Sequence, residues 1–221
     1  YASMKKWYHW LEPGAGRIRY FRGPTWLRHL NPGVFSRMTF RLKTPKDIRK
    51  MRAAGHLVAE AFEILEKNIR PGVSLFELDK LTEAFILSRN AETLYKGYRG
   101  GDPKHPPFPG VICASVNDEI CHGIPNGRAL KEGDIVGIDI GLRLDGFCGD
   151  ACVTFPVGEI CPEAARLLEI TQKCLGVGIE AARYGGYLGD IGKARKLDPQ
   201  QLAASFDTLP ADIAAVQGDL A

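Results

Sequence analysis

The chain has 221 residues, of which 45% are hydrophobic and 25% are charged, as is ordinary for a globular protein with a substantial core. No apolar stretch approaches the roughly 20 residues that a membrane-spanning helix needs. The 6 cysteines include no Cys-x-x-Cys pair, which favours reduced thiols and a cytoplasmic protein. The formal net charge of +3 hides an uneven distribution along the chain.

Residues 1–37 form a basic, aromatic-rich extension. They contain seven Lys or Arg side chains and one acidic residue, Glu12, and their aromatic residues follow no regular spacing. Three interpretations stay open: an organelle-targeting leader, a nucleic-acid-binding arm, or sequence upstream of a start at Met38. Because residues 38–221 carry a net charge of about −3, they present no basic face for specific nucleic-acid binding.

Helices are predicted at three places in the next region, residues 38–194. Thr44, Pro45 and Asp47 are typical of a helix start. The apolar residues that follow at three- and four-residue spacing are Ile48, Met51, Gly55, Val58, Phe62, Leu65 and Ile69. A second capping pair, Ser74 and Glu77, precedes a stripe predicted to be buried, Leu78, Leu81 and Phe85. The third helix is predicted over 163–183.

Two strands are predicted to form a hairpin. Residues 134–141 alternate between apolar and small or acidic side chains, and residues 147–155 resume a strand pattern after an Asp-Gly turn signal. With the hairpin centred between Leu144 and Asp145, Asp139 would lie opposite Asp150 on the same face. Two facing carboxylates at ~4 Å repel by about 1 kcal/mol in water and about 4 kcal/mol at an effective dielectric of 20. A bound cation would offset that repulsion, so we predict a metal site; the alternative is a solvent-facing or turn-capping pair.

A set of short motifs surrounds these aspartates. Residues 117–119 read Asn-Asp-Glu, His122 begins His-Gly-Ile-Pro, and the aspartates lie in Ile-Asp-Ile and Gly-Asp. In this order and at these spacings, the motifs resemble the type I methionine aminopeptidases of the pita-bread metallopeptidase group, over about residues 44–194. The resemblance implies an α+β pita-bread fold, in which helices cover one face of an antiparallel sheet.

The same resemblance implies a function. Such a metallopeptidase removes the initiator methionine from nascent chains with a small second residue, acting as a monomer in the cytoplasm and in proximity to the ribosome. Asp139 and Asp150 would hold two divalent ions (Co, Mn, Fe or Zn), and His122 would be catalytic and contact the substrate. Tyr95 and Tyr98 would line the pocket for the methionine side chain; alternatively, they are ordinary aromatic residues at a strand end.

The resemblance stops near Ala194. It would imply a further metal-binding histidine and two glutamates, yet no histidine follows His122, and the Ala- and Asp-rich residues 195–221 contain no glutamate. We therefore expect a catalytic domain that is incomplete at its C-terminal side, inactive alone, and derived from a truncated, frameshifted or split gene. The alternative is a non-catalytic pita-bread binding module, or a half-enzyme that needs a partner chain.

Overall fold

The computed structural model describes residues 42–194, so the predicted extension 1–37 and tail 195–221 lie outside the described residues. The elements in chain order are α2 (Pro45–Asn68), α3 (Leu75–Ser88), β1 (Glu92–Thr93), β2 (Ile112–Val116), β3 (Ile135–Leu144), β4 (Phe147–Pro156), α4 (Pro162–Ala181) and α5 (Leu188–Ala194). The three predicted helices and the hairpin are present, and the α+β class is confirmed. None of the helices within residues 42–194 is long and apolar enough to cross a membrane.

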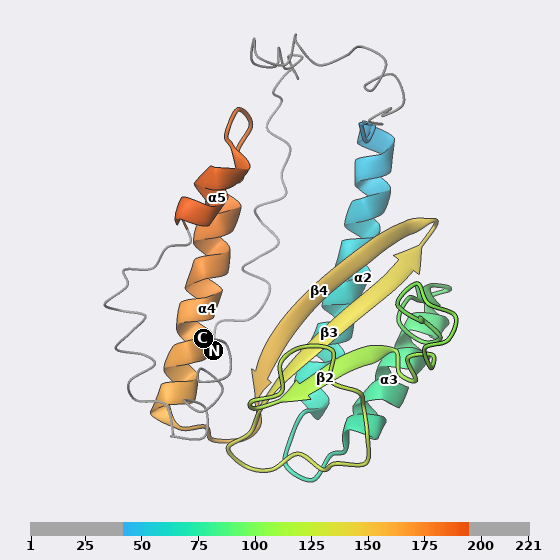
Figure 1. Cartoon of the computed structure of the whole chain (residues 1–221), viewed down its shortest axis with the longest axis vertical. Helices are drawn as coiled ribbons and strands as arrows, with labels where there is room; N and C mark the ends of the chain where they lie inside the picture. The colour runs from blue at the N-terminus through green and yellow to red at the C-terminus, as the bar shows by residue number, and fades with distance from the viewer. Residues whose placement is uncertain (1–41, 195–221) are drawn as a thin grey trace. The chain divides into compact units, whose positions relative to one another are not determined.

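The sheet is built around β3, which pairs antiparallel with β1, β2 and β4. Figure 1 shows β3 between β2 and β4. β4 pairs with β3 from Ile135 to Leu144, while β2 and the short β1 pair with successive parts of β3. Along β3, the side chains of Val136, Ile138 and Ile140 are fully buried, whereas Asp139 on the opposite face is half-buried. The predicted alternation therefore separates a core face from a face that carries the acidic residues.

Helices α2 and α3 cover the core face. Gly149 on β4 lies where α2 crosses the strand. A side chain does not fit there, because its Cβ would lie 2.6 Å from the carbonyl oxygen of Ala54. Nearby, the rings of Phe62 and Phe155 lie 6.1 Å apart. The glycine therefore allows the backbones of α2 and β4 to approach closely at this point.

Both predicted capping pairs form. Thr44 Oγ1 accepts a hydrogen bond from the Asp47 amide at 3.2 Å, and Ser74 Oγ accepts one from the Glu77 amide at 3.2 Å. The predicted buried stripes are only partly right, since Ile48 and Met51 are 48% and 40% exposed. The residues that the two helices bury are Ala54, Leu57, Val58, Ala61, Phe62 and Leu65 on α2, and Leu75, Leu78, Asp79, Thr82 and Ile86 on α3.

One buried carboxylate joins α3 to the sheet. Asp79 is 8% exposed, and its Oδ1 accepts hydrogen bonds from the backbone amides of Val111 at 2.7 Å and Ile112 at 3.1 Å. Burial raises the pKa of Asp79, while the two amide donors act in the opposite direction. The contact fixes the entry into β2, because Val111 directly precedes this strand and Ile112 is its first residue.

Helix α4 contributes little to the core. Of its 20 residues Gly178 alone is buried, while Leu175 and Ile179 are 56% and 49% exposed. The element that α4 packs against is α5, as Figure 1 also shows. The predicted third helix therefore exists, but its apolar side chains remain largely exposed.

Candidate metal centre

The hairpin turn sets the positions of the two aspartates. Asp145 and Gly146 both adopt positive φ angles, 49° and 81°, and form the two central residues of the turn. Asp150 consequently pairs with Gly141, and Asp139 pairs with Cys152. The predicted register, with Asp139 opposite Asp150, is wrong because it centred the turn one residue too early. The two aspartates still share one face, since the correction moves each partner by two residues.

A tyrosine hydroxyl brings the two carboxylates together. Tyr95 donates to Asp139 Oδ1 at 2.8 Å, and its hydroxyl also lies 3.3 Å from Asp150 Oδ1. The ring reaches this position because Gly141, the cross-strand partner of Asp150, has no side chain: a Cβ there would lie 2.6 Å from Tyr95 Cε1. Asp139 and Asp150 are thus diagonal neighbours whose oxygens meet at one phenol.

The surroundings of Asp139 favour its protonated form. The pKa of Asp139 is raised, mainly by burial and also by Asp150, against the opposing effects of the Tyr95 hydroxyl and His122. Burial and the same carboxylates raise the pKa of Tyr95 far above its ordinary range. The phenol therefore keeps its proton and acts as a donor toward the carboxylates.

The raised pKa of Asp139 predicts how stability changes with pH. Because the folded chain binds this proton more tightly than the unfolded chain, the favourable contribution is fully present below the ordinary aspartate pKa of 3.8 and is lost as pH rises through the raised pKa. In metal-free buffer, we expect the unfolding free energy of the wild type to fall relative to that of Asp139→Asn over this window. Urea unfolding at several pH values measures the difference, and a constant difference would contradict the assignment.

His122 lies in the loop between β2 and β3, close enough for its charge to lower the pKa of Asp139. It adopts a φ of 61°, which is uncommon for a residue with a side chain. The next residue, Gly123, is held against β2, since its amide donates to Ser115 Oγ at 3.1 Å and its carbonyl accepts from the Ala114 amide at 2.8 Å. A Cβ on Gly123 would lie 2.2 Å from the Ala114 carbonyl oxygen, so this close approach requires glycine.

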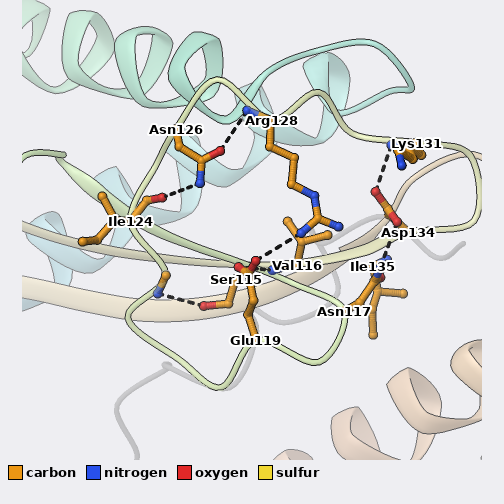
Figure 2. A network of polar contacts seen from close by, with 11 residues as sticks. Ser115, Val116, Asn117, Glu119, Ile124, Asn126, Arg128, Lys131, Asp134 and Ile135 are labelled. Atoms are coloured by element: carbon orange, nitrogen blue, oxygen red, sulfur yellow. Dashed lines mark hydrogen bonds and ion pairs between the residues drawn. The ribbon is translucent and has the colours of Figure 1, made fainter. Parts of the chain in front are cut away.

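Figure 2 shows the polar contacts that hold this loop at both ends. The Asn117 side chain donates to Asp134 at 2.9 Å and accepts from the Ile135 amide at 3.0 Å. Glu119 accepts from the Val116 amide at 3.0 Å and pairs with Arg128 at 3.1 Å.

The sequence analysis used Asn117 and Glu119 only as parts of a motif, and did not predict that their side chains hold the loop in place. The signal in the sequence is a cluster of polar residues close to Gly123, Pro125 and Gly127, which is typical of a loop whose side chains hydrogen-bond to its own backbone.

Tyr98 is not brought to the carboxylates by any described contact. Its side chain is 65% exposed, and its backbone carbonyl accepts from the Phe108 amide at 2.8 Å, within the loop that follows β1. Four of the residues predicted to act at the site lie near one another: Asp139, Asp150, Tyr95 and His122. The fifth, Tyr98, is an exposed residue of the loop that follows β1.

Cysteines flank Asp139 on both neighbouring strands. Cys113 on β2 and Cys152 on β4 are its cross-strand partners. Cys113 is buried, and burial, with further contributions led by Asp139 and Cys152, raises the pKa of its thiol to about 11. Cys121, Cys148 and Cys152 are exposed, and all six cysteines are free. Cys113 and Cys152 therefore lie on the same face of the sheet as Asp139.

The donor set fits a divalent cation only in part. Two carboxylates that converge on one hydroxyl supply hard oxygen donors. Within residues 42–194, however, no group of three or more His, Cys, Asp or Glu side chains is arranged to hold a metal ion. A catalytic metal site usually has three protein ligands and an open position, so the described residues provide one part of such a site.

The sheet thus carries helices on one face and a pair of carboxylates on the other. The chain matches the model of metallopeptidase family M24 over residues 49–197. It belongs to that family.

The chain is 45% identical over 152 residues to methionine aminopeptidase 1 of Bacillus subtilis, covering 69% of this chain and 58% of that protein. It is 41% identical over 154 residues to a methionine aminopeptidase of Helicobacter pylori, covering 70% and 58%. The crystal structure of methionine aminopeptidase from Rickettsia prowazekii superimposes with a TM-score of 0.67 at 40% identity, covering 72% of this chain and 61% of that one. The chain therefore spans somewhat less than two thirds of these relatives.

Proposed function

We propose that this chain carries the metal-binding hairpin of a methionine aminopeptidase, the activity that removes methionine from the N-terminus of newly made proteins. The observation that carries the proposal is the meeting of the Asp139 and Asp150 carboxylates at the Tyr95 hydroxyl, on the open face of the sheet. The named relatives at 41–45% identity support the same activity.

Membership of the family implies divalent metal ions. We infer that Asp139 and Asp150 hold them, with two ions per site drawn from Co, Mn, Fe and Zn. When bound, such ions lower the pKa of water toward about 7 and polarise a carbonyl group. Asp139 and Asp150 would hold the ions through their carboxylate oxygens. The half-burial of Asp139 would strengthen its attraction to an ion, because less water screens the charge.

His122 would act on the substrate. Its loop is fixed at Gly123 and at Asn117, so its imidazole is presented beside Asp139 without a large loss of conformational entropy on binding. From there the imidazole can donate a hydrogen bond to the oxygen of the scissile peptide, where charge develops during hydrolysis. Tyr95 and Tyr98 would border the methionine side chain. From the resemblance we also infer that the substrate has a small second residue, and that the protein acts as a monomer close to the ribosome.

A fusion protein tests this proposal. Residues 44–194 of this chain would replace the corresponding part of the Bacillus subtilis relative, which supplies the remainder of the domain. We expect the fusion to release methionine from a Met-Ala-Ser peptide in the presence of Mn²⁺ or Co²⁺, and Asp150→Ala to lower turnover by about 1000-fold or more because a ligand is lost.

The matched control is Asp145→Asn in the hairpin turn, which leaves both carboxylates in place and keeps a residue that tolerates the positive φ of this position. Thermal unfolding of each fusion checks that it is folded. A folded fusion that binds Mn²⁺ yet releases no methionine would contradict the proposed activity.

A further inference from the structure

The position of Tyr95 is built into the sheet. The residue before it, Leu94, donates its backbone amide to the Gly141 carbonyl at 3.1 Å, directly after β1 pairs with β3. On its other side, the Tyr95 ring meets the ring of Phe108 edge-on, with centroids 6.4 Å apart and an interplanar angle of 86°. These contacts, and the missing side chain at Gly141, aim the hydroxyl between the two carboxylates.

The hydrogen bonds are unequal. A phenol has one proton to donate, and the distance of 2.8 Å to Asp139 Oδ1 against 3.3 Å to Asp150 Oδ1 indicates that the hydroxyl donates it to Asp139. A carboxylate offers about four acceptor positions on its two oxygens. Asp139 therefore keeps Oδ2 and the second lone pair of Oδ1 for a cation while Tyr95 holds its orientation.

We propose that Tyr95 is a positioning residue for the cation-binding carboxylates, which acts by orienting Asp139 through its hydroxyl. This inference rests on the proposed function, because it presupposes that Asp139 and Asp150 bind cations. The proposed role of Tyr95 is additional to its predicted role in lining the pocket for the methionine side chain. Loss of such an outer partner of a metal ligand typically lowers metal affinity by about 10- to 100-fold.

The test measures cation affinity in the full chain. Tb³⁺, a hard cation that carboxylate oxygens bind, is titrated by calorimetry into the wild type and Tyr95→Phe. We expect Tyr95→Phe to weaken binding by about 10- to 100-fold, with an unchanged thermal unfolding midpoint. Tyr187→Phe removes a hydroxyl from a side chain that is 73% exposed and is the matched control, for which we expect wild-type affinity.

A second variant reaches the same contact from the opposite side. Gly141→Ala would push the Tyr95 ring away, because its Cβ would lie 2.6 Å from Cε1. We expect it to weaken Tb³⁺ binding as Tyr95→Phe does, and the double variant to bind no more weakly than either single variant, since both remove one interaction.

The outcomes separate this inference from the proposed function. Equal Tb³⁺ affinity in the wild type and Tyr95→Phe, together with lost binding in Asp139→Ala, would overturn the role of Tyr95 and leave the proposed metal site intact. Binding that survives Asp139→Ala, or no detectable binding by the wild type, would instead contradict the proposed metal site itself. Additive losses in the double variant would show that Gly141 acts independently of the hydroxyl, and would also overturn the inference.

Discussion

Replacing Asp79 by alanine is expected to lower the free energy of unfolding by about 3 kcal/mol, because two buried amides lose a charged acceptor. Val111 and Ile112 donate to the same Asp79 oxygen, and both residues are fully buried, so water cannot replace the carboxylate without opening the contact between α3 and β2. Folded domains are stable by only about 5–15 kcal/mol. Urea unfolding monitored by circular dichroism measures the loss.

Two controls show whether the acceptor or the charge matters. Asp79→Asn keeps an oxygen that can accept from both amides, so we expect a loss of about 1 kcal/mol. Asp118→Ala removes an exposed carboxylate and should change stability by no more than about 0.5 kcal/mol. If Asp79→Ala were as stable as Asp118→Ala, the buried contact would not contribute as described.

Local signals predicted the elements well. Thr44 with Asp47 and Ser74 with Glu77 mark helix starts that the structure contains, because capping depends on residues only three apart. The alternation along β3 likewise identified its buried face. These features follow from short-range geometry, which a single sequence records.

The hairpin register shows where such reasoning becomes less precise. The Asp-Gly pair was recognised, but the centre of the turn lies between Asp145 and Gly146, the two residues with positive φ, rather than before Asp145. A two-residue turn with positive φ at both positions favours Asn-Gly or Asp-Gly at its centre. Applying that preference strictly would have paired Asp150 with Gly141, as observed.

The contact between Tyr95 and Asp139 could not be predicted from spacing, because 44 residues separate them. The sequence does contain one signal. Gly141 interrupts a strand of mostly branched residues, and a glycine inside a strand often marks the close approach of another group. Which group approaches depends on the path of the loop after β1, and no local pattern determines that path.

We propose that Asp139 and Asp150 are carboxylates of a methionine aminopeptidase site whose set of ligands residues 42–194 do not complete. Asp139 and Asp150 converge on one hydroxyl, yet the structure over residues 42–194 shows no cluster of three metal-binding side chains. Each absent ligand reduces cation affinity and the geometry that lowers the pKa of bound water toward about 7. Weakly held ions would therefore activate water poorly.

Methionine release from a Met-Ala-Ser peptide by the purified chain tests this claim most directly. With Mn²⁺ or Co²⁺ present, we predict weak cation binding and no release above the rate of the peptide in buffer, for the wild type and for Asp139→Ala alike. Metal-dependent release by the wild type that disappears in Asp139→Ala would contradict the account, and would mean that other side chains of this chain, such as His105 or Asp118, complete the site.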